Sequence, residues 1–363
     1  MRSDAFHRAS RFLPAALTFF LLFLPALSSG TDYATGQKPS AASNPSGLFF
    51  GVALDGYPLT EQRLHEVHAA LGPNPSMVVF FMQWPEHPED GHFPWETLHA
   101  VDAFDALPCL TWEPMFIRHG EERVILADRI LGGTYDGYIR NFARSARDYG
   151  RPLLIRFAHE MNLSRYHWGV RPEEYGQNSP GFYQEMFRHV VRIFRQEQAG
   201  NALFVFCPNA ESLPHPVWSE DGAWNTAAAY YPGHDYVDVL GVDGYNWGTT
   251  QNLAEHGWDS TFRDFVDIMR PMYEELRALA PDKPLVVFET ASASQGGDKS
   301  AWIRQAVRTM ESWTVAGFVW FEADKEVDWR LAVGLEPEVI DFLRARTTQR
   351  AVDVLGPLAG VVE

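Results

Sequence analysis

The sequence predicts a single α/β catalytic domain folded as a (β/α)8 TIM barrel, and three observations support this prediction. Eight short runs rich in Val, Leu, Ile and Phe recur along the chain without regular polar alternation. Such runs are typical of strands buried on both faces, as in a parallel sheet. Segments with helical periodicity separate the runs, which indicates βα units. An open doubly wound sheet is the alternative, but no glycine-rich phosphate loop follows the first run.

The apolar runs locate the expected strands. They cover residues 47–54, 76–84, 107–112, 152–160, 202–209, 237–247, 284–291 and 317–324. Active sites of such barrels lie at the C-terminal ends of the strands. The polar and aromatic residues that end the runs are therefore the functional candidates: Asp55, Gln83, Trp84, Trp112, Glu113, Arg156, His159, Glu160, Asn209, Asp243, Tyr245, Trp247, Glu289, Trp320 and Glu322.

Three of the intervening segments are predicted to be helices with identifiable ends. The first begins at a capping Thr60 and stops at Gly72. The second covers residues 180–200, and its apolar residues recur four apart. The third begins at a capping Asp298 and runs to residue 310.

The termini are expected to lie outside the barrel domain, which we place at residues 47–350. Residues 1–28 combine a basic start, an apolar core and small residues at 26–28, the pattern of a secretory signal peptide. An uncleaved membrane anchor is the alternative. Residues 29–46 are polar and proline-containing and predict a flexible linker, and 351–363 a C-terminal tail. We expect a secreted or periplasmic protein.

Charge and cysteine content bear on the partners of the protein and on its redox chemistry. The formal net charge of −17 disfavours nucleic acid or an anionic membrane as a partner. The two cysteines, Cys109 and Cys207, each end an apolar run and are expected to be buried free thiols, although an exported protein could pair them. We expect a monomer that uses no cofactor.

The pair His159–Glu160 does not fit a metal site. A zincin needs HExxH on a helix, so that two histidines share one face. Here the next histidine is His167, and the pair follows an expected strand. The sequence also holds no G-x-S-x-G nucleophile elbow and no G-x-x-x-x-G-K-[ST] phosphate loop.

Two glutamates, Glu160 and Glu289, end strongly apolar strands. Burying a lone carboxylate is costly, but glycoside hydrolysis requires one neutral acid beside one charged nucleophile. Arg156 precedes Glu160 by four residues and, by strand alternation, is expected to share its face and to keep Glu289 ionised. Tyr245 is expected to donate a hydrogen bond to Glu289.

Other residues at the same rim suit sugar binding. His159 is expected to contact substrate hydroxyls, and Trp168, Trp247 and Trp320 are candidate platforms for sugar rings. A single glutamate at a strand end is more often part of a loop salt bridge, and a single tryptophan is usually core. The convergence of these residue types on one rim is what favours a site.

Four segments together resemble glycoside hydrolase family 26, whose members are retaining (β/α)8 glycosidases: "RFAHEMNLSRYHWG", "VDVLGVDGYNW", "VVFETASASQGGDKSAWI" and "VWFEADKEVDWR". The resemblance implies that Glu160 is the acid/base and Glu289 the nucleophile. It also implies roles in substrate binding for Arg156, His159 and Tyr245, with Trp320 as the sugar platform.

The substrate that the resemblance implies is a β-1,4-mannan, cleaved internally. The segment after Asn162 departs from the mannanase-like pattern, because Leu163, Ser164 and Arg165 stand where a glycine and an acid are usual. Other β-glycans therefore remain alternatives: a mixed-linked glucan, a xylan or a bacterial exopolysaccharide. A non-catalytic sugar-binding barrel is the alternative from another functional class.

Overall fold

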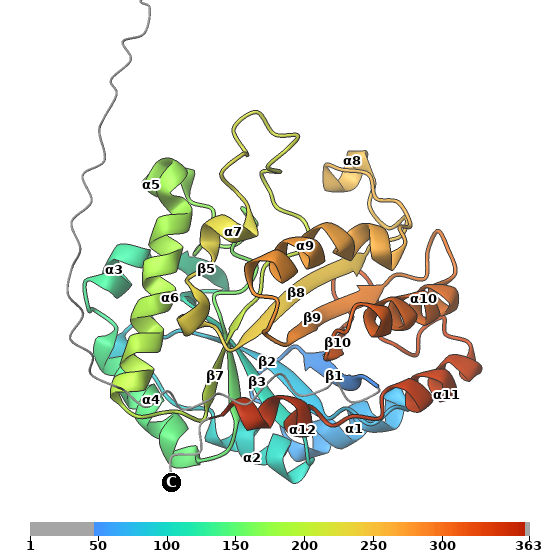
Figure 1. Cartoon of the computed structure of the whole chain (residues 1–363), viewed down its shortest axis with the longest axis horizontal. Helices are drawn as coiled ribbons and strands as arrows, with labels where there is room; N and C mark the ends of the chain where they lie inside the picture. Colours follow the sequence, from blue (N-terminus) through green and yellow to red (C-terminus); the bar gives the residue numbers. More distant parts are fainter. Residues whose placement is uncertain (1–46, 360–363) are drawn as a thin grey trace, which may run out of the picture. The chain divides into compact units, whose positions relative to one another are not determined.

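The computed structural model describes residues 47–359, and a closed barrel of eight parallel strands forms its centre (Figure 1). The barrel strands are β1 (Phe49–Leu54), β2 (Met77–Gln83), β3 (Leu107–Glu113), β6 (Leu153–Phe157), β7 (Ala202–Phe206), β8 (Val239–Asn246), β9 (Leu285–Ser292) and β10 (Gly317–Phe321). Each strand pairs with the next in this order, and β10 pairs with β1. All eight predicted strands are therefore present, and the predicted barrel is confirmed.

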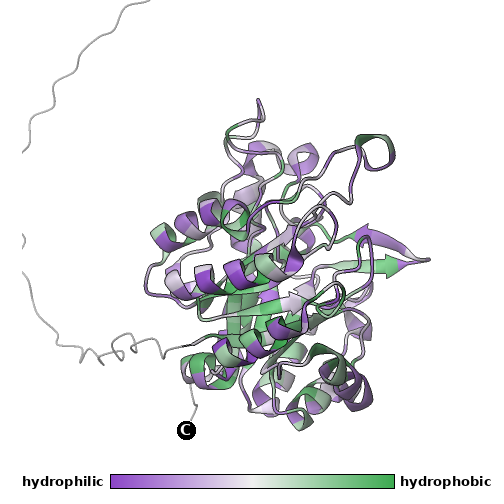
Figure 2. Ribbon diagram, turned by 90° about the vertical axis from the view of Figure 1, so that its right-hand side faces the viewer, coloured by the Kyte–Doolittle hydropathy of each residue, from purple (hydrophilic) through white to green (hydrophobic). Residues whose placement is uncertain are grey.

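Helices follow the strands and surround the barrel. They are α1 (Glu61–Leu71), α2 (Trp95–Ala103), α3 (Ala127–Leu131), α4 (Asp136–Tyr149), α5 (Pro172–Tyr175), α6 (Ser179–Gln196), α7 (Ala227–Tyr230), α8 (Leu253–His256), α9 (Phe265–Leu279), α10 (Lys299–Ser312), α11 (Pro337–Arg346) and α12 (Ala351–Leu355). Short 3-10 turns are η1 (Pro88–Asp90), η2 (Gly176–Asn178), η3 (His234–Tyr236) and η4 (Gly356–Leu358). Figure 2 shows hydrophobic strands enclosed by helices with hydrophilic outer faces. Within residues 47–359, none of these helices has the length and hydropathy needed to cross a bilayer.

The predicted helix starts are confirmed at two positions. The Thr60 side chain accepts a hydrogen bond from the Arg63 N–H, and Asp298 accepts one from Ala301 N–H. These bonds satisfy amides that have no partner within the helix. The second predicted helix was extended too far. It ends at Gln196, and Gln198 adopts a left-handed φ of 59°.

A hairpin that the sequence did not predict follows β3. Its strands are β4 (Met115–Arg118) and β5 (Glu121–Val124), paired antiparallel, and they project from the barrel at the right of Figure 2. Strand β5 alternates exposed and partly buried residues, and β4 passes from buried Met115 to exposed Ile117 and Arg118, so neither forms a long buried apolar run. It places Glu122 near the C-terminal ends of the barrel strands, where it bonds to the loop after β6.

The C-terminal segment requires a correction to the predicted boundary at residue 350. Residues 351–358 form α12 and η4 instead of a tail, and both Ala351 and Leu355 are fully buried. Just before them, Gln349 bridges to Phe49 on β1. A five-residue helix is too short to produce a periodic signal in the sequence. The signal peptide predicted at 1–28 and the linker at 29–46 lie outside the described residues.

Candidate active site

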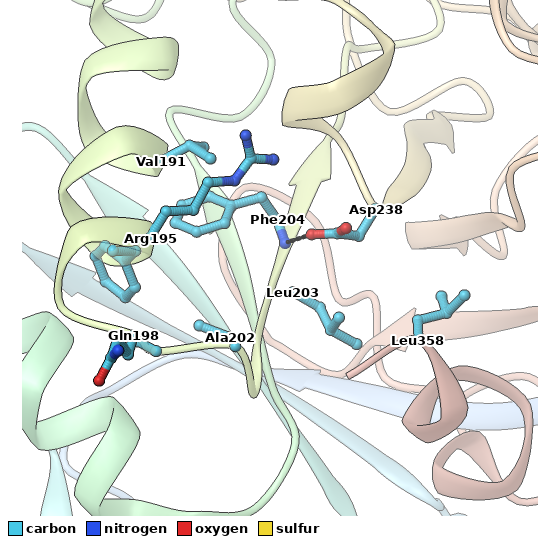
Figure 3. A pocket seen from close by; sticks show the side chains of 11 residues that line it. Val191, Arg195, Gln198, Ala202, Leu203, Phe204, Asp238 and Leu358 are labelled. Atoms are coloured by element: carbon cyan, nitrogen blue, oxygen red, sulfur yellow. Dashed lines mark hydrogen bonds between the residues drawn. The ribbon is translucent and has the colours of Figure 1, made fainter. Parts of the chain in front are cut away.

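One pocket lies away from the predicted site. It has a volume of about 380 Å³ and is lined by Arg195, Gln198 and Leu358 together with the start of β7 (Figure 3). There the Asp238 carboxylate accepts a hydrogen bond of 2.8 Å from the Phe204 N–H. This is the N-terminal end of the strands, where barrel residues serve stability and not catalysis.

At the opposite, C-terminal end, Arg156 organises the barrel interior. Its guanidinium is fully buried and donates to Thr111 Oγ1 on β3 at 2.9 Å and to Asp243 Oδ2 on β8 at 2.6 Å. It also donates to Glu289 Oε1 on β9. Burial opposes the charge of Arg156, but the carboxylates of Asp243 and Glu289 outweigh it and raise its pKa. Arg156 is therefore a fixed cation shared by two acids from neighbouring strands.

Glu289 has a hydrogen-bond donor at each carboxylate oxygen. Arg156 bonds to Oε1, and the Tyr245 hydroxyl donates to Oε2. Burial, followed by the charge of Glu289, raises the pKa of Tyr245 well above its usual range, so Tyr245 stays a donor. The carboxylate is 5% exposed and lies in the interior of the barrel mouth. These contacts stabilise negative charge on Glu289.

Glu160 lies close enough to Glu289 for the two charges to interact, but its surroundings differ. Its Oε1 accepts a hydrogen bond of 2.6 Å from Asn209 Nδ2, and the Tyr166 side chain also hydrogen-bonds to this carboxyl. Burial, together with the nearby charge of Glu289, raises the pKa of Glu160 to about 7. The two carboxyls therefore differ in their surroundings: a guanidinium and a phenol bond to Glu289, whereas burial and a neighbouring charge favour the protonated form of Glu160.

The route by which Glu160 reaches the site differs from the prediction. Strand β6 ends at Phe157, so strand alternation does not extend to residue 160. Instead Ala158 and Glu160 take left-handed φ values of 50° and 49°, and the Glu160 N–H bonds to the Cys207 carbonyl on the next strand. The chain turns sharply here, and the turn aims the carboxyl into the barrel mouth. Positive φ at residues other than glycine is strained and often marks a functional position.

His159 is buried beside the acid pair. Burial, followed by the charges of Arg156 and Arg165, lowers its pKa well below the usual value and keeps the ring neutral. Its Nδ1 has no hydrogen-bond partner within residues 47–359. The ring contacts Tyr166 and Trp168 at centroid distances of 4.8 and 5.7 Å. Trp168 in turn donates to the His159 carbonyl at 2.6 Å, which fixes the loop after β6.

The three predicted tryptophan platforms differ in their exposure. Trp247 is half-buried and packs edge-to-face on Trp329 and on the partly exposed Trp258. Trp168 is 4% exposed and stacks on Tyr166 at 4.7 Å. Its ring is therefore buried in the loop after β6, where it stabilises the loop and has little free surface for stacking on a sugar.

Trp320 occupies a different place from the one predicted. It is 1% exposed, donates to the Trp329 carbonyl at 2.8 Å and contacts Trp302 of α10, so it packs between the barrel and a helix. It offers no ring face to a sugar in this structure. Its neighbour Phe321 faces the barrel mouth and contacts Tyr245 at 5.7 Å. Strand alternation allows only one of two adjacent residues to face inward, and the run "VWFE" does not reveal which.

Some partners of the acid pair were not assigned from the sequence. Asn209 and Asp243 were recognised as strand ends, but the bonds from Asn209 to Glu160 and from Arg156 to Asp243 depend on strand register. Tyr166 was not recognised as a site residue, because it lies in the loop after β6 and does not end an apolar run. The predicted free thiols are confirmed, since Cys109 and Cys207 are both buried and unpaired.

Comparison with known proteins agrees with this geometry. The model of glycosyl hydrolase family 26 matches residues 130–283, which include Arg156, Glu160 and Tyr245. Over these residues the chain matches glycosyl hydrolase family 26. The resemblance predicted from the sequence is thus confirmed.

Relatives of this chain carry two kinds of name. It is 31% identical over 304 residues to a protein named endoglucanase H from Acetivibrio thermocellus, a match covering 82% of this chain and 30% of the relative. It is 26% identical over 188 residues to a mannan endo-1,4-beta-mannosidase from Bacillus subtilis, covering 51% and 41%. The chain spans less than half the length of either relative.

A solved structure confirms the fold of this chain. A modular endo-beta-1,4-mannanase from Cellulomonas fimi superposes with a TM-score of 0.55 at 18% identity, covering 84% of this chain and 71% of that one. At this level of identity the likeness concerns the barrel fold alone.

Proposed function

We propose that this chain is a retaining glycosidase that cleaves β-linked polysaccharides internally. The observation that carries the proposal is the contrast between its two buried glutamates. Glu289 accepts hydrogen bonds from Arg156 and Tyr245 at its two oxygens, whereas burial and the neighbouring charge raise the pKa of Glu160 to about 7. One is suited to attack as an anion and the other to donate a proton.

The reaction then has two steps. In the first, a Glu289 oxygen attacks the anomeric carbon as the glycosidic bond breaks, and Glu160 transfers its proton to the departing oxygen. In the second, Glu160, now a carboxylate, takes a proton from water as the water oxygen displaces Glu289 from the same carbon. Glu160 ends protonated, Glu289 ends ionised, and two inversions leave the sugar with its original anomeric configuration.

For the substrate we propose a β-1,4-mannan, with a β-glucan as the second candidate. Relatives named mannan endo-1,4-beta-mannosidase support the first. The endoglucanase H match supports the second, because it covers more of this chain at higher identity. Half-buried Trp247 and inward-facing Phe321 would provide apolar contact to either sugar.

A panel of polysaccharides tests the proposed activity. Wild type, Glu160→Ala and Glu289→Ala are incubated with β-1,4-mannan, mixed-linked β-glucan, carboxymethyl cellulose and xylan, and new reducing ends are counted. We expect wild type to release reducing ends from at least one polymer and both variants to lose that release. Binding of a polymer without any release would instead establish a non-catalytic sugar-binding barrel. Full activity of Glu289→Ala would refute the assigned nucleophile.

We further propose that the protein acts outside the cytoplasm as a monomer, with the barrel domain preceded by a cleaved signal peptide and a linker. The support is the basic, apolar and small-residue pattern of residues 1–28 and the polar composition of 29–46. Large extracellular polysaccharides are the substrates that such export would give access to.

A further inference from the structure

We propose that Glu113, positioned by Gln83, is a third carboxyl group of the cleft that binds sugar hydroxyls and thereby helps to select the substrate. The inference rests on the proposed glycosidase function and assigns part of its substrate recognition. It concerns residues on β2 and β3, on the side of the mouth away from Asn209.

The strand register places Glu113 in the barrel mouth. On β3, Thr111 faces inward, since its hydroxyl accepts from the buried Arg156 guanidinium. Glu113 follows Thr111 by two residues on the same strand and therefore points to the same side, one step nearer the C-terminal rim. Its carboxyl is consequently on the same inward face as the acid pair, and it is 6% exposed.

Gln83 fixes the orientation of this carboxyl. It is the register partner of Glu113 on β2, and its Nε2 donates to Glu113 Oε2. Within residues 47–359, Glu113 Oε1 accepts no hydrogen bond, and it is not among the fully buried polar atoms that lack a partner, so this oxygen is open to solvent at the mouth. One oxygen of this carboxyl is thus fixed by Gln83, while the other is free to accept a hydrogen bond from a ligand that enters the mouth.

The loop after β6 forms the adjacent wall. Arg165 makes a two-pronged ion pair with Glu122 of β5, with distances of 2.7 and 2.6 Å, and His167 bonds to the same carboxylate at 3.1 Å. The charge of Glu113 contributes to the raised pKa values of Arg165 and Tyr166, so these side chains lie near it. Glu113 therefore lies within electrostatic reach of the Arg165–Glu122 pair.

The chemistry of Glu113 and Gln83 suits a sugar. A carboxyl oxygen accepts from a hydroxyl, and the amide of Gln83 offers both a donor and an acceptor. The two side chains together match neighbouring hydroxyls on one ring. Because hydroxyl orientation distinguishes mannose from glucose, a fixed acceptor here would respond to the identity of the sugar. A site built to bond a hydroxyl strongly rejects rings that cannot present it.

Binding to an inactivated enzyme tests the inference separately from catalysis. In a Glu160→Gln background, mannohexaose, cellohexaose and a mixed-linked β-glucan hexasaccharide are titrated by calorimetry, with and without Glu113→Gln. We expect Glu113→Gln to weaken the best-bound sugar about 10- to 100-fold, the loss typical of one hydrogen bond to a charged group. Gln83→Leu should weaken it less, and the ratio between mannohexaose and cellohexaose affinity should change in both variants.

Glu322→Gln is the matched control, because it makes the same substitution after another barrel strand. Its carboxyl bonds to the Leu331 N–H, outside the mouth. It should leave all three affinities unchanged. Unchanged affinities and an unchanged ratio in Glu113→Gln would overturn the inference. Failure of wild type to hydrolyse these sugars while Glu113→Gln still weakens binding would count against the proposed function only.

Discussion

At the scale of single residues, the different contacts of Glu160 and Glu289 give the two carboxyl groups different chemical properties. Glu289 accepts from the guanidinium of Arg156 and a phenol, whereas Glu160 bonds to an amide and a phenol and lies near the negative charge of Glu289. The sequence predicted the pair and the Arg156 and Tyr245 contacts, because these residues end apolar strands. It could not predict Asn209 as the partner of Glu160, since that contact depends on how β6 and β7 are aligned.

Replacement of the proposed acid should show a dependence on the leaving group. Glu160→Gln removes the transferable proton but keeps the shape, so hydrolysis of the polysaccharide should fall about 100- to 10,000-fold. Hydrolysis of a 2,4-dinitrophenyl glycoside, whose leaving group needs no proton, should fall far less in the first step. Steady-state and burst kinetics on both substrates measure the contrast. Equal losses on the two substrates would contradict the assigned role.

The pKa of Glu160 predicts one limb of the pH profile. A general acid works in its protonated form, so kcat/KM should fall as pH rises through about 7, the value to which burial and Glu289 raise this pKa. Since burial also raises the pKa of Glu113 to about 7, the profile is measured in Glu113→Gln as well. The fall of kcat/KM with rising pH should persist in Glu113→Gln. If the fall disappears in this variant, the titrating group is Glu113 and not Glu160.

At the scale of elements, the strands were predictable and the segments between them less so. Each barrel strand is buried on both faces and leaves a continuous apolar run in the sequence. The β4–β5 hairpin and α12 leave no such run, because one is half exposed and the other has only five residues. The sharp turn at Ala158 and Glu160 was also missed, since positive φ at these residues has no sequence signature.

The packing of α12 gives a stability prediction. Leu355 is fully buried, so Leu355→Ala should lower the free energy of unfolding by about 2–5 kcal/mol. Leu358, on the adjoining η4 turn, is 42% exposed, and Leu358→Ala should change it by no more than about 0.5 kcal/mol. Urea unfolding of both variants measures the difference. A negligible effect of Leu355→Ala would mean that the segment after residue 350 does not contribute to the folded domain.

At the scale of the whole molecule, the two ends of the barrel have different roles: residues at the N-terminal ends of the strands stabilise the fold, and those at the C-terminal ends form the candidate active site. The pocket in Figure 3 lies at the N-terminal ends of the strands, whereas Arg156, Glu160 and Glu289 meet at the C-terminal ends. Closure of the sheet brings together residues from β3, β6, β8 and β9 that are distant in the chain. This clustering was predictable, because all strands of such a barrel are parallel and their C-terminal ends lie at the same rim.

Export is predicted for the complete chain. When it is expressed in a bacterium with a general secretion pathway, the protein should appear outside the cytoplasm with its N-terminus near residue 29, after the small residues at 26–28. Intact mass and N-terminal sequencing of the exported protein measure this. A membrane-bound protein that retains Met1 would support the anchor alternative.

Covalent trapping tests the central claim, that Glu289 attacks the sugar, most directly. Enzyme active on a glycan is incubated with the 2,4-dinitrophenyl 2-deoxy-2-fluoro glycoside of the matching sugar, which slows the second step, and is then digested and sequenced by mass spectrometry. We predict one fluorosugar per chain, attached to Glu289 in the peptide that contains "VVFETA", and none on Glu289→Ala. A sugar attached to a different residue would contradict this account.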